Sequence, residues 1–272
     1  MAEPTWPTVP TCVEAGEPGK RPSLVFLHGI GGRAWGWRAQ LDHFAAAGWH
    51  TLAWDMPGYG DSAPVRDMDF DHLAAALDAL LADRGIERAV LVGHSMGGMV
   101  ALQAWARHPS RVAGLVLAAS SPAFGHGSGG FQTRFLADRL APLEAGQTLA
   151  DIAARLIPSM AGPDASPDGL ALAQACMGSI TPEGYRSALR ALIRFEQRAA
   201  LSTIAVPTLC LAGEHDRTAA PVVVRRMAER IPGAAYVEMP GAGHLMNFEQ
   251  PEAFSAALSA FLEPHFPAET RP

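Results

Sequence analysis

The chain has 272 residues, a formal net charge of −6 at pH 7 and a hydrophobic content of 49%. This length fits one large domain or one domain with an insertion, and the hydrophobic content excludes a generally disordered chain. Acidic and basic residues are mixed along the chain, which excludes the basic patch or stripe of a nucleic-acid-binding protein. Cys12, Cys176 and Cys210 are widely scattered, so we expect neither a disulfide framework nor a cysteine metal site.

The distribution of apolar residues argues against two further classes, secreted proteins and membrane-spanning proteins. The N-terminal residues have no basic start followed by an apolar core, so we expect no secretory signal. No stretch approaches the ~18 uninterrupted apolar residues that a membrane-spanning helix needs. We therefore predict a protein of the cytoplasm with neither a membrane nor a nucleic acid as its partner.

The first 121 residues alternate short apolar runs with longer segments of helical periodicity. Strands are predicted at residues 23–28, 50–55, 88–92 and 112–119, with a short N-terminal strand within 8–15. Helices are predicted at residues 37–47, 70–83 and 96–107. Strands that alternate with helices indicate βαβ units and a mostly parallel central sheet flanked by helices, with strands buried on both faces.

This alternation stops between residues 122 and 206. That region has no strand-like run and holds helical stretches interrupted at Pro142, Pro158, Pro163, Pro167 and Pro182. The alternation then returns, with strands predicted at 207–213 and 235–239, helices at 222–230 and 252–262, and a loose tail at 264–272. We therefore predict an α/β core formed by residues 1–121 and 207–272, with a helical insertion at 122–206.

The strongest chemical signal is Gly93-His94-Ser95-Met96-Gly97, which follows a predicted strand and precedes a predicted helix. This is the G-x-S-x-G pattern in the strand–turn–helix context that identifies a nucleophilic serine. The turn is so tight that a side chain at either flanking glycine would clash. It also places the serine at a helix N-terminus, where free N–H groups favour negative charge. Ser95 is therefore the predicted nucleophile.

Four further motifs accompany this serine. They are H-G-I-G-G at 28–32, D-M-P-G-Y-G-D-S at 55–62, G-E-H-D at 213–216 and G-A-G-H at 241–244. With these motifs in this order, the chain resembles the α/β-hydrolase fold superfamily over residues 23–262. The resemblance implies an α/β-hydrolase fold in which the insertion at 122–206 is a helical cap over the active site.

The resemblance also implies a Ser-His-Asp triad, in the chain order Ser, Asp, His that this fold uses. His244 follows the last predicted strand in a glycine-rich loop, beyond the sheet edge where ligands gather, and is the predicted general base. The family pattern puts the acid three residues past Gly213, which selects Asp216 to orient the histidine. Glu214 is the local rival for that role.

Further site residues follow from the same resemblance. The backbone N–H groups of Ile30 and Met96 are expected to form an oxyanion hole for the tetrahedral intermediate. His28 is expected to be structural, and Asp55 is expected to cap the turn that follows it. No metal-ligand cluster or dinucleotide fingerprint stands in the right context, so we predict no metal and no organic cofactor.

Within the superfamily the chain is similar to the enol-lactonase and carboxylesterase group, so a small carboxylic ester or lactone is the predicted substrate. Hydrolases that cleave carbon–carbon bonds of ring-fission products are also similar, but they usually carry an aromatic residue where this chain has Leu245. Dehalogenases and most epoxide hydrolases of this fold use an aspartate nucleophile, and Ser95 argues against both. Two other classes stay open, a hydrolase-fold ligand receptor and a cofactor-free perhydrolase or oxygenase.

The predicted insertion carries one charge pattern. Arg186, Arg190 and Arg194 recur every four residues on a predicted helix and therefore form a stripe. The stripe is either a carboxylate-binding face or a solvated helix face, and we favour the solvated face. The natural substrate, other substrate-binding residues and the oligomeric state stay open at this point.

Overall fold

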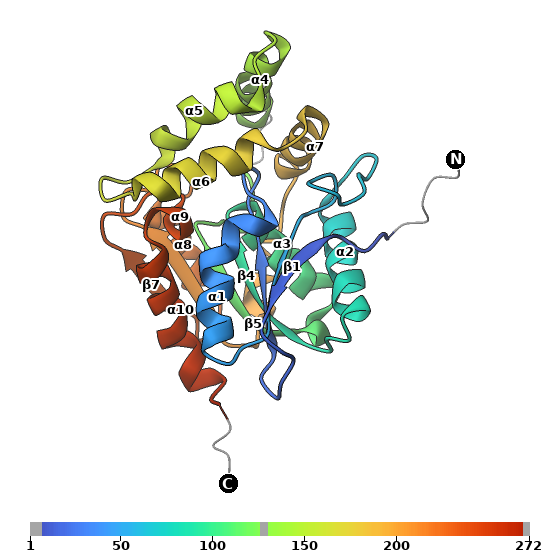
Figure 1. The fold of residues 1–272 in the computed structure, drawn as a ribbon, viewed down its shortest axis with the longest axis vertical. Coiled ribbons are helices and arrows are strands. Elements are labelled where there is room, and N and C mark those ends of the chain that lie inside the picture. The colour runs from blue at the N-terminus through green and yellow to red at the C-terminus, as the bar shows by residue number, and fades with distance from the viewer. Residues whose placement is uncertain (1–6, 126–129, 269–272) are drawn as a thin grey trace.

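The structure is a computed structural model that describes residues 7–125 and 130–268. Within these residues, seven strands form one sheet in the order β1-β3-β2-β4-β5-β6-β7 (Figure 1). β1 pairs with β3 in antiparallel orientation, and the other neighbouring strands are parallel, as predicted. The strands are Cys12–Ala15 (β1), Ser23–Leu27 (β2), Thr51–Trp54 (β3), Ala89–His94 (β4), Val112–Ala118 (β5), Thr208–Gly213 (β6) and Ala235–Met239 (β7).

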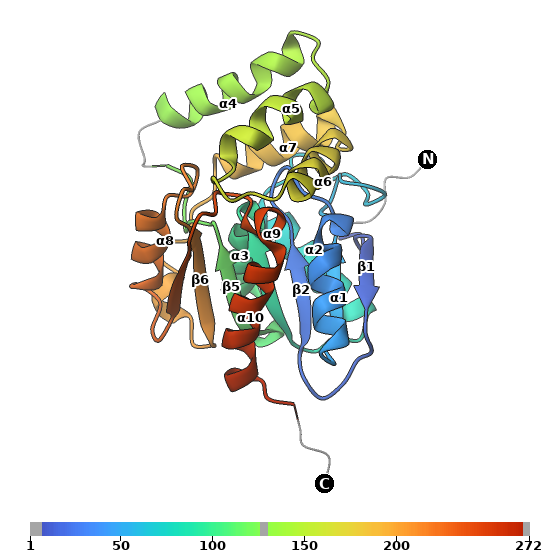
Figure 2. The same ribbon diagram turned by 60° about the vertical axis from the view of Figure 1, so that its left-hand side comes forward.

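Helices cover both faces of this sheet. α1 and α10 lie on one face, and α2 and α3 lie on the other (Figures 1 and 2). Every residue of β2, β4, β5 and β6 is buried between the two layers, which explains their continuous apolar runs. The helices of the core are Arg38–Ala46 (α1), Phe70–Asp83 (α2), Met96–Arg107 (α3), Pro221–Ala228 (α8), Met246–Glu249 (α9) and Pro251–His265 (α10), with short 3-10 helices at Ala34–Trp37 (η1) and Pro109–Arg111 (η2).

Most predicted elements are present, and α2, α3 and β7 have the predicted bounds. The N-terminal strand is shorter than the segment 8–15 that was available to it, and the predicted helix at 37–47 begins as η1. The predicted loose tail is wrong for residues 264 and 265, which are helical because Phe261 and Leu262 pack into the core and hold the last turn of α10. Residues 269–272 of that tail lie outside the described residues.

Within the described part of the insertion between β5 and β6, the short 3-10 helix Leu201–Thr203 (η3) follows four α-helices. They stand above the carboxyl ends of the parallel strands (Figure 2). The part of the insertion that the structure describes contains no strand, apart from one isolated bridge between Ala123 and Glu196. The helices are Gly130–Glu144 (α4), Leu149–Met160 (α5), Pro167–Gly178 (α6) and Pro182–Leu192 (α7).

The prolines of the insertion act less uniformly than predicted. Pro167 and Pro182 each occupy the first position of a helix, where a missing N–H costs no hydrogen bond. Pro142 and Pro158 do not interrupt helices, because they lie inside the last turns of α4 and α5. None of the helices within residues 7–125 and 130–268 is long and apolar enough to span a membrane.

Candidate active site

Ser95 lies in a strained turn between β4 and α3. Its backbone has φ 53° and ψ −117°, a conformation that costs a residue with a side chain on the order of 1–3 kcal/mol. A Cβ atom on Gly93 would lie 2.4 Å from the backbone of Gly97, and one on Gly97 would lie 1.9 Å from the Leu27 carbonyl oxygen. Close packing therefore requires both of the glycines that flank the serine.

A line of hydrogen bonds connects Ser95 to Asp216 through His244. His244 Nε2 lies 3.0 Å from Ser95 Oγ, and His244 Nδ1 lies 2.8 Å from Asp216 Oδ2. Because an ionised carboxylate only accepts hydrogen bonds, Nδ1 carries the proton and Nε2 accepts from the serine hydroxyl. The three side chains come from the loops after β4, β6 and β7. The structure thus brings together the three residues that the sequence predicts for the triad.

Asp216 is held as an ionised carboxylate. It is 3% exposed, and its Oδ1 accepts hydrogen bonds from the N–H groups of Thr218 at 2.7 Å and Ala219 at 2.9 Å. Burial acts to raise its pKa, but the hydrogen bonds from His244 and from these two N–H groups hold the pKa below its usual value. Asp216 can therefore stabilise a positive charge on the His244 ring.

Glu214, the rival acid, has other partners. Its Oε2 accepts a hydrogen bond from the Gly241 N–H at 2.9 Å, and half of the side chain is exposed to solvent. Glu214 therefore joins the loop after β6 to the loop after β7. Asp216 is the acid of the pair whose side chain meets the His244 ring.

A buried carboxylate that the sequence analysis missed holds the His244 loop. Glu249 is 1% exposed and accepts hydrogen bonds from the N–H groups of Gly243 and Leu245, both at 2.7 Å. The same side chain accepts from the Gly162 N–H at 2.8 Å, in the loop between α5 and α6. Glu249 therefore fixes both neighbours of His244 and ties them to the insertion. An acid five residues after a histidine is too common a feature to have identified this role.

Two buried, uncharged histidine rings form hydrogen bonds to backbone groups around the site. His94 Nε2 donates to the His244 carbonyl at 2.7 Å. His28 Nδ1 donates to the Gly29 carbonyl at 2.8 Å, and its Nε2 accepts from the Met56 N–H at 3.1 Å. Burial lowers the pKa of His94 to about 3 and the pKa of His28 to about 4, so both rings are uncharged at neutral pH. The structural role predicted for His28 agrees with these bonds.

The predicted oxyanion-hole groups lie next to the serine. A Cβ atom on Gly29 would lie 3.1 Å from Ser95 Cβ, so the loop that carries Ile30 runs against the nucleophile. Met96 directly follows Ser95 as the first residue of α3. Within the described residues, neither the Ile30 nor the Met96 N–H donates to a backbone oxygen. The Tyr59 hydroxyl donates to the Ile30 carbonyl at 2.9 Å, which fixes the peptide unit that directly follows the one carrying the Ile30 N–H.

Asp55 does not cap the turn that follows it, contrary to the expectation. Its carboxylate forms an ion pair with Arg33 (Oδ1–Nε 2.8 Å) and accepts from the Ala34 N–H at 2.9 Å. The turn at 56–62 satisfies N–H groups of its own through backbone hydrogen bonds, which leaves the carboxylate available for these partners. Asp55 therefore joins the end of β3 to the segment that follows the loop at 28–32.

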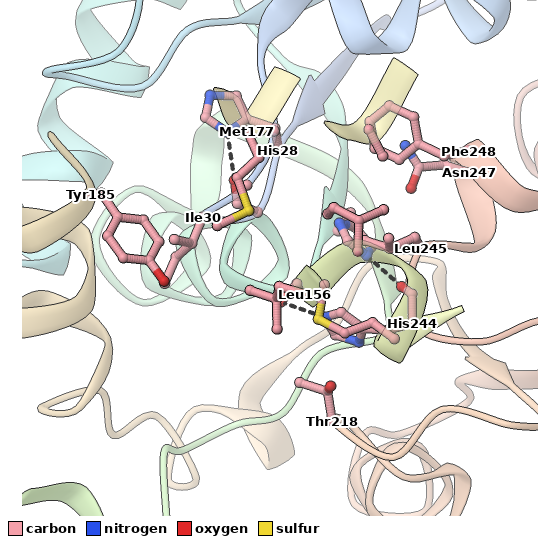
Figure 3. Close-up of a pocket in the computed structure, with 18 of the residues that line it drawn as sticks. His28, Ile30, Leu156, Met177, Tyr185, Thr218, His244, Leu245, Asn247 and Phe248 are labelled. Atoms are coloured by element: carbon pink, nitrogen blue, oxygen red, sulfur yellow. Dashed lines mark hydrogen bonds between the residues drawn. The ribbon is translucent and has the colours of Figure 1, made fainter. Parts of the chain in front are cut away.

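A pocket of about 790 Å³, its opening to solvent included, lies between the triad and the inserted helices (Figure 3). Ser95, His244 and the loop at 28–32 form one side of the pocket. The insertion contributes aliphatic and aromatic side chains to the other side, together with Arg139 and Tyr185. Neither of these two residues was identified from the sequence.

The arginine stripe of the insertion does not reach this pocket. Arg186 pairs with Glu183 at 3.5 Å, Arg194 donates to the Met68 carbonyl at 3.0 Å, and Arg190 is exposed. None of the three arginines lines the pocket. The structure therefore favours the solvated helix face over a carboxylate-binding face. Within residues 7–125 and 130–268 no three potential metal-ligating side chains cluster, so we name no metal ligand.

Comparison with known proteins places this geometry in a family. The chain is 33% identical to epoxide hydrolase A of Mycobacterium tuberculosis, with 92% of each chain covered. It is 32% identical to the pimeloyl-[acyl-carrier protein] methyl ester esterase of Edwardsiella ictaluri, with 90% of this chain and 94% of that protein covered. The crystal structure of the enol-lactonase from Burkholderia xenovorans LB400 matches with a TM-score of 0.83 at 26% identity, over 93% of this chain and 95% of that one.

The family itself is identified by a match that spans most of the chain. Residues 22–251 match the protein family described as alpha/beta hydrolase fold. This range includes the strained serine turn and the loops that carry Asp216 and His244. The chain therefore belongs to the alpha/beta hydrolase fold family.

Proposed function

We propose that the chain is a serine hydrolase that cleaves a small carboxylic ester or lactone through an acyl-enzyme intermediate. The observation that carries this proposal is the hydrogen-bonded line from Ser95 Oγ through the His244 ring to Asp216. A neutral serine hydroxyl is a weak nucleophile and needs such a base within hydrogen-bond reach. The esterase and the lactonase among the similar proteins carry names that agree with this chemistry.

In the first half of the reaction, Ser95 Oγ attacks the carbonyl carbon while His244 Nε2 takes the hydroxyl proton. Asp216 keeps the ring in the required tautomer and stabilises the imidazolium. The N–H groups of Ile30 and Met96 stabilise the oxyanion of the tetrahedral intermediate. In another hydrolase, one such donor contributes on the order of 3 kcal/mol. The intermediate then collapses, and the alcohol leaves with the proton that His244 holds.

In the second half, water replaces the alcohol. His244 Nε2 takes a proton from the water as the oxygen attacks the acyl carbon, and the same N–H groups hold the second oxyanion. Collapse returns the proton to Ser95 and releases the acid. A lactone follows the same steps, except that the leaving alcohol stays attached to the acyl chain.

Two features favour this reaction over related ones. Ser95 stands where most epoxide hydrolases of the fold carry an aspartate nucleophile, although one relative bears the name epoxide hydrolase. Leu245 follows His244, where the hydrolases of ring-fission products usually carry an aromatic residue. We further propose that residues 122–206 act as a cap that shapes the substrate pocket. A location in the cytoplasm stays a prediction of the sequence.

The test is the reactivity of Ser95. A fluorophosphonate probe should label Ser95, and Ser95→Ala should lower turnover of 4-nitrophenyl acetate by roughly 10⁴- to 10⁶-fold without a change in melting temperature. Labelling of another residue, or full activity of Ser95→Ala, would contradict the nucleophile assignment. Parallel assays with a ring-fission product, and with peroxide plus a carboxylic acid, separate the ester reaction from the alternatives.

A further inference from the structure

The wall of the pocket carries a single formal charge outside its histidines. Among the described residues that line the pocket, Arg139 is the only lysine, arginine, aspartate or glutamate. Arg139 lies on α4, and its guanidinium carbon is 5.3 Å from the centre of the Phe135 ring, which also lines the pocket. The remaining wall around it is mostly aliphatic and aromatic.

This cation has no acidic partner among residues 7–125 and 130–268. The ion pairs and hydrogen bonds found there include none from Arg139 to a carboxylate, whereas Arg186 on α7 pairs with Glu183. Arg134 on the same helix is exposed and does not line the pocket. An arginine that is half buried in an apolar wall gains most from an anion that completes its hydrogen bonds.

A buried hydroxyl stands near this charge. Tyr185 on α7 is 2% exposed, lines the pocket and makes no hydrogen bond through its hydroxyl to the described residues. In Figure 3 its hydroxyl points into the pocket on the side of Ile30. Burial raises the pKa of Tyr185 and the positive charge of Arg139 opposes that rise, so the two groups interact. The hydroxyl keeps its proton at neutral pH and can donate it to an acceptor.

We propose that Arg139 and Tyr185 form a subsite for a carboxylate of the substrate, so that the enzyme prefers an ester or lactone bearing a second, ionised acid group. The inference rests on the proposed function and specifies its substrate class. A carboxylate matches the single charge and the planar fork of a guanidinium. A phosphate dianion would leave one negative charge uncompensated against an apolar wall.

The experiment compares matched charged and neutral esters. One pair, monomethyl and dimethyl adipate, places the carboxylate on the acyl side, and a second pair, 4-acetoxybutanoate and butyl acetate, places it on the alcohol side. For each pair, the ratio of kcat/KM for the charged ester to kcat/KM for the neutral ester is measured in the parent, Arg139→Leu, Arg139→Lys and Tyr185→Phe. Arg134→Leu is the matched control, because it removes an exposed arginine from the same helix.

Arg139→Leu should lower this ratio by about 10- to 100-fold in at least one pair, the loss expected for one charge-assisted hydrogen-bonded contact. Arg139→Lys keeps the charge but loses the fork and should fall between the parent and Arg139→Leu. Tyr185→Phe should lower the ratio by less than about tenfold, and Arg134→Leu should leave it within about twofold. A ratio that Arg139→Leu leaves unchanged in both pairs overturns the proposal.

A binding arm separates this proposal from the proposed function. If the parent hydrolyses none of the four esters, the proposed function fails, and calorimetric titration with adipate still tests the subsite. Adipate that binds to the parent and to Arg134→Leu but not to Arg139→Leu supports the subsite. Adipate that binds equally to Arg139→Leu, or that does not bind to the parent, rejects it.

Discussion

The core and the insertion bring side chains to the pocket in different ways. In the core, Ser95, Asp216 and His244 stand at the ends of strands, in loops whose backbones touch one another closely. In the insertion, Arg139 and Tyr185 project into the pocket from the faces of α4 and α7. The comparison suggests that the core sets which bond is broken, whereas the insertion sets which molecule is accepted. Substitutions in the two regions should therefore differ in kind.

After the nucleophile Ser95 itself, the largest effect is expected from Asp216 in the core. Asp216→Asn preserves the shape of the side chain but favours the wrong tautomer of His244, so kcat should fall by up to ~10⁴ for every ester. Glu214→Gln should cost less than tenfold, because Glu214 contacts Gly241 and His215 and not the His244 ring. Both variants are assayed at one pH with one ester, after their melting temperatures are compared with the parent. A greater loss in Glu214→Gln would reverse the assignment of the acid.

Glu249 lies where the two regions meet and should have an intermediate effect. Glu249→Gln turns an amide donor toward N–H groups that need acceptors, at a cost of about 1–3 kcal/mol. We expect kcat to fall about tenfold for charged and neutral esters alike, with a lower melting temperature. Glu252→Gln, an exposed acid on α10, is the control. Parent-like kcat and melting in Glu249→Gln would show that the carboxylate does not position His244.

Lowering the pH should lower the free energy of unfolding through the buried histidines His28 and His94. Both histidines have lowered pKa values in the folded state, about 4 and about 3, against ~6.5 in an unfolded chain. The unfolded state therefore binds more protons below pH 6.5, and the free energy of unfolding falls as the pH falls. Each histidine should cost about 2 kcal/mol at pH 5 relative to pH 7.

Urea unfolding at the two pH values measures this loss. His43→Gln, which removes an exposed histidine, should show the same difference between pH 7 and pH 5 as the parent. Equal unfolding free energies at both pH values would mean that the two buried rings accept protons in the folded state.

The smallest effect is expected from the arginine stripe of the insertion. Arg190→Ala should change kcat/KM by less than about twofold for charged and neutral esters, because an exposed side chain outside the pocket contributes little. The measurement is the same ratio of charged to neutral esters that tests Arg139. If Arg190→Ala lowered the charged-to-neutral ratio of kcat/KM as much as Arg139→Leu, the stripe would affect substrate preference as strongly as the pocket wall. That result would contradict the distinction between the two surfaces.

The same comparison explains what the sequence could predict. The serine turn needs glycine at 93 and 97 because backbone atoms occupy the space that a side chain would fill. This requirement appears in the sequence as the short pattern G-x-S-x-G, which can be recognised without the structure. Arg139 has no such constraint, since Arg134 and Arg139 share one helix and only the packing of α4 decides which faces the pocket. Glu249 was missed for a related reason, because its three N–H partners come from two loops that are far apart in the chain.

The junction between the histidine loop and the insertion has a consequence for chimeric enzymes. Four hydrogen bonds cross it: His244 N–H to the Met160 carbonyl, Gly162 N–H to Glu249 Oε2, Asp164 N–H to the Gly241 carbonyl and Ser166 N–H to the Glu249 carbonyl. A graft that exchanges the whole of residues 122–206 for the equivalent part of a relative must rebuild all four. A graft that exchanges only α4 keeps them and still replaces Arg139. On the proposed role of Arg139, exchanging α4 alone should therefore be enough to change the substrate preference.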